Sequence, residues 1–211
     1  MKYYPVFLDI RGKSCLVVGG GNVARRKVKS LLDAGAVVKV ISPELISSLK
    51  SLVENGKIKY LKREFRKEDL KGSAIVIVAT GDRELNWKIY REATRFNILC
   101  NVVDDPELCH FTVPSSISRG DLQIAVSTSG KSPTLAREIR KKLEKIFGRE
   151  YEKYLNLMGE IRTEVLQQVA SPAKRKKIFD ALSRSRILSH LKRGKMREAS
   201  RESRRIIQKH L

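Results

Sequence analysis

Three consecutive glycines follow a short apolar run near the start of the chain and precede a stretch with helical spacing. Gly19 permits a tight turn off a strand, Gly21 lets the backbone approach a pyrophosphate, and Ala24 allows a helix to pack closely. A helix N-terminus presents free N–H groups and a positive dipole end, which favour phosphate. The pattern therefore predicts a dinucleotide site, with a plain tight turn as the alternative. The predicted phosphate contacts are Gly19, Gly21, Asn22, Val23 and Ala24.

The next apolar run, residues 36–41, predicts a second buried strand, as a β-α-β unit requires. Ser42, Pro43 and Glu44 follow it, where a Rossmann unit meets the adenosine ribose. An acidic side chain there repels a 2′-phosphate, so Glu44 favours NAD over NADP. The alternative is that Pro43 and Glu44 open the next helix, predicted over residues 43–54.

Two further strands are predicted over residues 73–79 and 97–103, with a helix over 82–95 between them. The first is a nearly continuous apolar run, which is typical of a strand covered on both faces. The carboxyl ends of parallel strands meet at one edge of the sheet, and ligands bind at that edge. Ala79, Thr80 and Asn101 therefore complete the predicted cofactor contacts.

The chain carries 44 Lys and Arg against 23 Asp and Glu, a formal net charge of +21. This balance predicts attraction to polyanions. No helix-turn-helix, zinc-finger or aromatic RNA-binding pattern accompanies the charge. Basic runs such as residues 174–177 fall on polar helix faces, so we expect no nucleic-acid partner. A small polycarboxylate is the anionic ligand that we expect instead.

No apolar run approaches the length of a membrane span, and residues 1–5 do not open a secretion signal. We therefore expect a cytoplasmic protein without a membrane partner. Cys15, Cys100 and Cys109 lack metal-ligand spacing, and we expect no bound metal.

The alternation of single strands and helices stops after Pro106. Residues 111–114 and 122–127 are predicted as short strands and residues 133–147 as a helix. Apolar residues then recur at helical spacing from Glu150 onward. A helical C-terminal module thus follows a short β-α segment.

Six motifs stand in a fixed order along the first two thirds of the chain. They are residues 4–9, 15–27, 78–80, 100–104, 111 with 114–115, and 125–133. Together they resemble the siroheme-synthase family, whose members are precorrin-2 dehydrogenases and in some cases also sirohydrochlorin ferrochelatases. Beyond Glu150 the resemblance is limited to a basic helical tail of similar length. Some members carry a fused methyltransferase domain, which we expect to be absent because the sequence ends at Leu211.

The resemblance implies oxidation of precorrin-2 to sirohydrochlorin, with NAD as the cofactor, in a homodimer. The predicted class is α/β, a Rossmann-type parallel-sheet domain followed by a small β-α dimerisation segment and an α-helical C-terminal module. The predicted boundaries are 1–113 for the NAD-binding domain, 114–148 for the dimerisation and substrate segment, and 149–211 for the helical module.

The resemblance also implies roles for individual residues. Asp104 stands where the family has a functional aspartate, although an Asp before Pro106 is also an ordinary turn residue. By its closeness in sequence to Asp104, His110 is a candidate proton carrier and substrate contact in the same cleft, with a partly exposed loop histidine as the alternative. The segment similar to the family's substrate loop consists of Ser127, Thr128, Ser129, Gly130 and Lys131.

Two functional questions stay open at this point. Dehydrogenase activity alone is preferred over an additional ferrochelatase activity. No cluster of metal ligands is visible in the sequence, but a chelatase needs only a transient metal contact and a base, so ferrochelatase activity stays open. The alternatives from another class are a regulatory Rossmann protein that senses NAD(H) without catalysis, and a nucleic-acid binder with a vestigial cofactor site.

Overall fold

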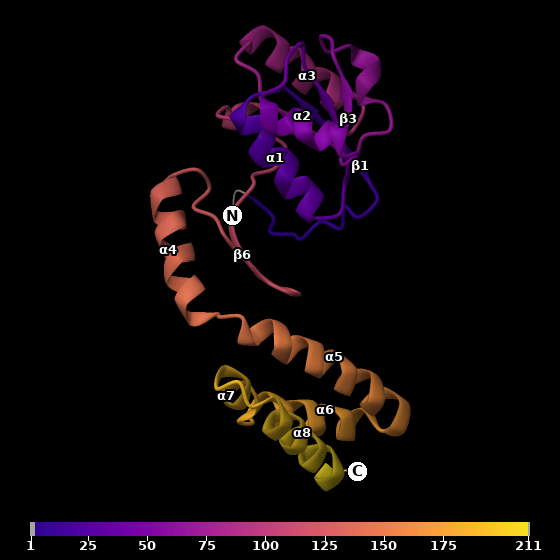
Figure 1. Ribbon diagram of the computed structural model, residues 1–211, viewed down its shortest axis with the longest axis vertical. Helices are drawn as coiled ribbons and strands as arrows, with labels where there is room; N and C mark the ends of the chain where they lie inside the picture. The colour runs from indigo at the N-terminus through magenta and orange to yellow at the C-terminus, as the bar shows by residue number, and fades with distance from the viewer. Residues whose placement is uncertain (1–2, 211) are drawn as a thin grey trace. The chain divides into compact units, whose positions relative to one another are not determined.

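The computed structural model describes residues 3–210 (Figure 1). The outermost residues of the predicted domains, 1–2 and 211, lie outside the described residues. The chain divides into two compact units, with the boundary between Val113 and Pro114.

The first unit is a five-stranded parallel sheet in the order β3-β2-β1-β4-β5, which confirms the predicted Rossmann-type sheet. Its strands are β1 (Ser14–Val18), β2 (Val37–Ile41), β3 (Lys59–Leu61), β4 (Ile75–Val78) and β5 (Leu99–Val102). Its helices are α1 (Asn22–Asp33), α2 (Ser47–Glu54) and α3 (Arg83–Arg95), with 3-10 turns η1 (Lys67–Leu70) and η2 (Pro106–Leu108).

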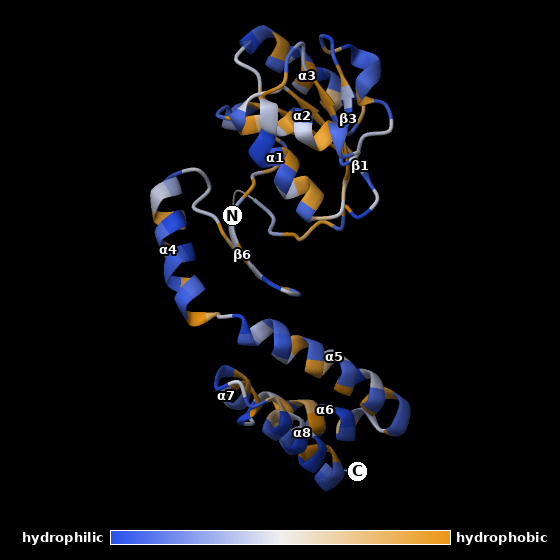
Figure 2. Ribbon diagram, in the orientation of Figure 1, coloured by the Kyte–Doolittle hydropathy of each residue, from blue (hydrophilic) through white to orange (hydrophobic). Residues whose placement is uncertain are grey.

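The sheet is buried on both faces, as its apolar strands predict. In β1, Cys15 and Val17 belong to a core cluster with α1 and α2, whereas Leu16 and Val18 belong to a second cluster with α3. All four side chains are at most 3% exposed. Figure 2 shows orange, hydrophobic strands beside helices that carry both orange and blue residues. Alternation along the strand thus supplies a hydrophobic contact to each helical layer.

Two predicted elements differ from the structure. The helix predicted from residue 43 begins at Ser47, because Ile46 is extended, with φ −67° and ψ 156°, and acts as its N-cap. The strand predicted over residues 111–114 is wrong. The strand lies at Ser115–Arg119 instead, directly after Pro114, whose ring nitrogen has no hydrogen for a sheet ladder.

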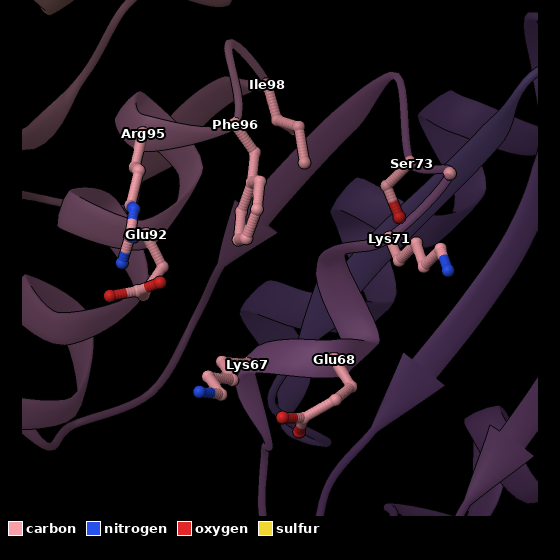
Figure 3. Close-up of a pocket in the computed structure, with 9 residues that line it drawn as sticks. Lys67, Glu68, Lys71, Ser73, Glu92, Arg95, Phe96 and Ile98 are labelled. Atoms are coloured by element: carbon pink, nitrogen blue, oxygen red, sulfur yellow. The ribbon is translucent and has the colours of Figure 1, made fainter.

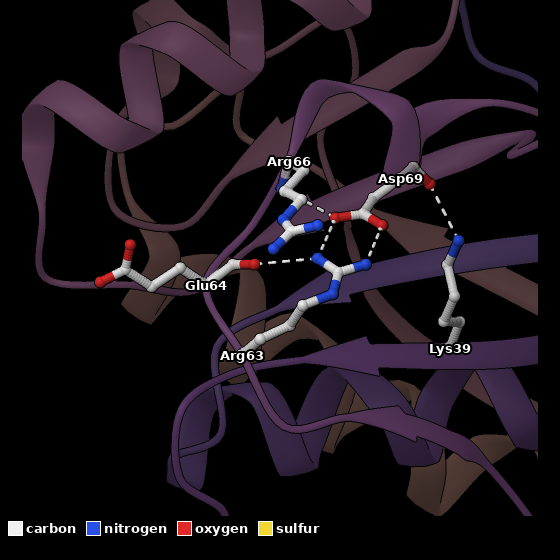
Figure 4. A network of polar contacts seen from close by, with 5 residues as sticks. All are labelled: Lys39, Arg63, Glu64, Arg66 and Asp69. Carbon is white, nitrogen blue, oxygen red and sulfur yellow. Dashed lines mark hydrogen bonds and ion pairs between the residues drawn. The ribbon is translucent and has the colours of Figure 1, made fainter.

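Asp69 holds the connection between β3 and β4 together (Figure 4). Its carboxylate is 7% exposed and accepts two hydrogen bonds from Arg63, at 2.6 and 2.8 Å. The Arg66 N–H donates to the same carboxylate at 2.8 Å, and Lys39 Nζ donates to the Asp69 carbonyl at 2.9 Å. Burial on its own would raise the pKa of Asp69, but these donors outweigh it and the pKa is lowered.

We expect Asp69→Ala to lower the free energy of unfolding by about 2–4 kcal/mol, because the donors around a buried carboxylate lose their acceptor. In the wild type, a lowered folded-state pKa adds stability above the unfolded pKa of about 3.9. That contribution is lost as the pH falls through the folded pKa. Urea unfolding between pH 2 and 7 tests both statements, and an Asp69→Ala protein with wild-type stability at pH 7 contradicts them.

The second unit begins with an antiparallel hairpin of β6 (Ser115–Arg119) and β7 (Leu122–Val126). Helix α4 (Pro133–Ile146) packs on both strands. Leu135 and Ile146 of α4 are 47% and 58% exposed, so this small β-α layer covers its apolar side chains incompletely.

Four helices follow and form a core of their own: α5 (Glu150–Gln168), α6 (Pro172–Ser183), α7 (Ile187–Lys192) and α8 (Met196–His210). This confirms the helical C-terminal module. The buried hydrophobic residues of this core are Ile161, Val165, Val169, Ile178, Leu182, Ile187, Leu191, Ala199 and Ile207.

Candidate functional site

The glycine turn lies where the carboxyl ends of β1, β2 and β4 meet. The Gly19 N–H donates to the Ile41 carbonyl at 2.9 Å. A Cβ on Gly19, whose φ is +119°, would meet the Ala79 carbonyl, and a Cβ on Gly20 would meet the Glu44 carbonyl. These two glycines let the chain segments approach with no side chain between them. Gly20 was not among the predicted site residues, although the run of three glycines marks it.

Gly21 differs from its neighbours because the space beside it is open. A Cβ there would have no heavy atom within 4 Å. Gly21 is the N-cap of α1, which has neither a side-chain cap nor an acidic residue in its first turn. The N–H groups of Asn22, Val23 and Ala24 have no carbonyl four residues earlier in the helix. The open, uncapped N-terminus therefore fits a pyrophosphate.

The loop after β2 places Ser42, Pro43 and Glu44 beside this turn. Ser42 is buried, whereas Pro43 and Glu44 are exposed. The Ile46 N–H donates to the Gly20 carbonyl at 3.0 Å, which ties the loop to the glycines. Because α2 begins after this loop, the alternative that Pro43 and Glu44 open a helix is wrong.

Ala79 and Thr80 follow β4 at the same edge. The Thr80 hydroxyl donates to Asn86 Oδ1 at 2.5 Å, and Asn86 Nδ2 donates to the Thr80 carbonyl at 3.3 Å. Asn86 is 9% exposed, so this pair fixes the turn from β4 into α3. Asn86 was not predicted. Its signal is a polar residue on the same helix face as the buried Ile89 and Ala93.

Asn101 lies inside β5 and is buried. Its Nδ2 donates to the Phe111 carbonyl at 2.9 Å and to Cys109 Sγ at 3.4 Å. The amide thus holds the returning segment against β5. The Asn101 side chain already has these two partners. Its contact with the cofactor stays a prediction.

Asp104 lies two residues beyond the end of β5, exposed and in a left-handed conformation with φ +63°. Asp adopts this conformation more readily than most residues other than glycine, and such outliers cluster at functional sites. The Val103 N–H donates to the Val78 carbonyl at 2.9 Å, which fixes the turn beside the end of β4. The structure therefore brings Asp104 to the same sheet edge as the glycine turn.

Lys27 of α1 brings a positive charge toward this turn. Burial lowers the pKa of the Lys27 ammonium and the charge of Arg26 lowers it further, whereas Cys109 and Asp104 raise it. The influence of Asp104 on this pKa places the two side chains in one electrostatic environment. Lys27 was not among the predicted site residues, and helical spacing alone does not reveal its proximity to a turn 77 residues later.

His110 lies against the first half of β5 and the end of α3. Its Nδ1 accepts the Cys100 N–H at 3.1 Å, and its Nε2 is 3.0 Å from the Thr94 hydroxyl oxygen. The ring centroid lies 5.0 Å from that of Tyr90. Both ring nitrogens thus have protein partners, and this geometry favours a structural role over the predicted substrate contact.

The predicted substrate loop belongs to the second unit and is held by its own hydrogen bonds. The Ser129 N–H donates to Ser127 Oγ at 3.1 Å. The N–H of Ser132, the N-cap of α4, donates to Thr128 Oγ1 at 3.1 Å. Ser129 and Gly130 are left-handed, with φ +54° and +82°. Lys131 is exposed. The hydroxyl oxygens thus shape the loop, and contact with a substrate stays a prediction.

Among residues 3–210, no group of three or more His, Cys, Asp or Glu side chains is placed to hold a metal ion. No helix in that range is long and apolar enough to cross a membrane. The three cysteines are free, and burial raises the pKa of Cys100 to about 12.

The strand order and the uncapped N-terminus of α1 define a Rossmann-type dinucleotide-binding protein. Residues 6–115 match a family described as "Putative NAD(P)-binding". Residues 119–146 match "Sirohaem biosynthesis protein central", and residues 150–207 match "Sirohaem synthase dimerisation region". The chain belongs to the siroheme synthase family, and the first match supports the predicted NAD cofactor. The dimerisation description falls on the four C-terminal helices, whereas the sequence prediction attached it to residues 114–148.

Individual relatives agree with these matches. The chain is 38% identical over 202 residues to siroheme synthase of Photorhabdus laumondii. This alignment covers 96% of the present chain and 43% of the relative. It is 41% identical over 182 residues to siroheme synthase 3 of Aeromonas hydrophila, in an alignment that covers 86% of this chain and 39% of that relative. The chain thus spans less than half the length of these relatives. The solved structure of "SirC, precorrin-2 dehydrogenase" is 26% identical, with a TM-score of 0.78 over 96% of this chain and 100% of that one.

Proposed function

We propose that this chain is a cytoplasmic, NAD-dependent dehydrogenase that oxidises precorrin-2 to sirohydrochlorin in siroheme biosynthesis. The observation that carries the proposal is the likeness to SirC, which extends over the full length of that solved precorrin-2 dehydrogenase. The open glycine turn and the left-handed aspartate at one sheet edge are the local features that support it. A protein that only senses NAD(H) needs no carboxylate at this edge.

In this proposal the first turn of α1 binds the pyrophosphate through the N–H groups of Asn22, Val23 and Ala24. Gly21 leaves the path to these groups open, and Glu44 binds the adenosine ribose. When bound, NAD supplies the acceptor for the hydride that leaves precorrin-2. The oxidation also releases a proton, and Asp104 accepts it or positions the macrocycle for its release.

Precorrin-2 carries eight carboxylates, and the positive charge of the chain attracts such an anion. Lys27 contributes one positive charge; burial lowers its pKa, and the carboxylate of Asp104 opposes that shift by raising the pKa. In the second unit, Lys131 and the hydroxyls of Ser127, Thr128 and Ser129 are proposed to bind acetate and propionate arms.

The direct test supplies precorrin-2 and NAD, with and without Fe²⁺, and follows NADH absorbance, sirohydrochlorin and siroheme separately. We expect NADH and sirohydrochlorin to form in equal amounts without iron. Tight NAD binding with no turnover would instead support the sensor. Siroheme formed faster with the protein than without it would add ferrochelatase activity to the dehydrogenase.

Cofactor choice is expected to follow Glu44, whose carboxylate repels a 2′-phosphate. We expect kcat/KM with NAD to exceed that with NADP by about 10-fold or more, a difference of about 1.4 kcal/mol. Glu44→Gln should narrow this ratio by improving the NADP reaction. Equal turnover of the wild type with both cofactors would show that Glu44 does not face the ribose.

We also propose that the protein is a homodimer, since residues 150–207 match a dimerisation region. The two-stranded hairpin and α4, with Leu135 and Ile146 exposed, leave apolar surface for a second copy. Light scattering at micromolar concentration should give twice the chain mass of 24.0 kDa. A monomer at that concentration would contradict the proposal.

A further inference from the structure

A pocket with a volume of about 680 Å³ lies at the end of the sheet opposite to the glycine turn (Figure 3). Two connections line it, the loop that follows η1 and the turn that follows α3. Ser73 lies two residues before β4, and Ile98 lies directly before β5. The pocket is therefore at the amino ends of these strands, whereas the glycine turn is at their carboxyl ends.

One wall of the pocket is apolar and is formed by Phe96 and Ile98. Phe96 is 54% exposed, although it follows a helix whose inner face is well packed. The next residue, Asn97, is left-handed with φ +54°, and the Ile98 N–H donates to the Ala93 carbonyl at 2.9 Å. This hydrogen-bonded helix end fixes the backbone that carries Phe96. The wall is thus a preformed aromatic surface that faces solvent.

The pocket also carries excess positive charge. Lys67, Lys71 and Arg95 line it, together with Glu68 and Glu92. Within residues 3–210, none of the three cationic side chains forms an ion pair. An anionic group that enters the pocket would therefore meet three cations that are not held in ion pairs, against two carboxylates.

Ser73 adds a buried hydroxyl without a partner to the residues that line this pocket. The residue is 8% exposed, and its hydroxyl oxygen has no hydrogen-bond partner among the described residues. It lies on the loop opposite Phe96 (Figure 3). A buried hydroxyl without a partner is destabilising, and native proteins almost always satisfy it. Because this oxygen is buried from solvent, a ligand oxygen accepts its proton only after the side chain rotates about its Cα–Cβ bond.

We propose that this pocket binds a small aromatic anion. The planar body packs on Phe96 and Ile98, and a carboxylate or phosphate lies among Lys67, Lys71 and Arg95. The Ser73 hydroxyl, rotated toward the pocket, donates to an oxygen of the same ligand. The volume suits such a molecule, and the site is separate from the dinucleotide site, so it does not depend on the proposed reaction.

The test uses the full chain with NAD present and 2-naphthyl phosphate as the probe. Backbone amide NMR should show shifts at residues 67–73 and 92–98, with none at Gly19–Gly21. Calorimetry should show that inorganic phosphate and 2-naphthol each bind about 10-fold or more weakly than the probe, because each retains only half of the contacts. Absence of shifts at residues 67–73 and 92–98 with millimolar probe would overturn the proposal.

Variants distinguish binding of the probe in this pocket from nonspecific binding to exposed aromatic residues. Phe96→Ala is expected to raise the Kd of the probe about 10-fold, the usual scale for a lost stacking contact. Trp87→Ala is the matched control, since Trp87 is a similarly exposed aromatic on α3 that packs on Arg91 outside the pocket. Ser73→Ala should weaken binding severalfold without loss of thermal stability. Equal effects of Phe96→Ala and Trp87→Ala would contradict the site.

Discussion

Gly21→Val is expected to abolish NAD binding while the protein stays folded. The position has φ and ψ of −91° and −169°, which valine adopts without strain, and no heavy atom lies within 4 Å of a Cβ there. The added side chain occupies the open approach to the N–H groups at the start of α1. We expect the Kd for NAD to rise at least about 100-fold, or about 2.7 kcal/mol. Calorimetric titration measures the affinity, and thermal unfolding measures the stability.

Gly20→Ala is the variant to compare with Gly21→Val, because it changes the neighbouring glycine. Gly20→Ala places a Cβ against the Glu44 carbonyl, so the loop after β2 must move away from the turn. We expect this smaller substitution to lower the free energy of unfolding by about 1–3 kcal/mol, the scale of overpacking. Unchanged NAD affinity in a folded Gly21→Val protein would remove the basis for the cofactor site.

The parallel sheet and its glycine turn could be predicted because they depend on local patterns. Residues 75–78 are apolar at every position, which is typical of a strand covered on both faces. Three glycines between a strand and a helix likewise define a turn over a few residues. Such signals do not depend on which distant segments come together.

The prediction was weaker where the deciding contact is distant in sequence. Ile46 is extended because its N–H bonds to Gly20, and no local pattern reveals that bond. His110 was placed near Asp104 by sequence proximity, yet its ring packs against Thr94 and Tyr90 of α3. The electrostatic influence of Asp104 on Lys27 likewise appears only once α1 and β5 belong to one sheet domain.

Asp104→Asn is expected to remove most of the dehydrogenase activity without loss of NAD binding. Asparagine keeps the size of the side chain and tolerates the left-handed conformation at φ +63°, so the fold is retained. The substitution removes the carboxylate that is proposed to accept the proton or position the macrocycle. We expect kcat to fall about 10²-fold or more, the usual scale for a positioned acid-base group. Steady-state kinetics with precorrin-2 and calorimetry with NAD give the two quantities.

Asp105→Asn is the control for loss of negative charge in the same turn. Asp105 has φ −130° and is half-buried, and its carbonyl accepts the Leu108 N–H at 3.2 Å. Its side chain therefore projects from a backbone of different conformation, and we expect kcat within about threefold of wild type, since one exposed or half-exposed charge contributes less than about 1 kcal/mol. Equal losses in the two variants would indicate a general electrostatic effect of the turn. Full activity of Asp104→Asn would show that Asp104 only shapes the turn before Pro106.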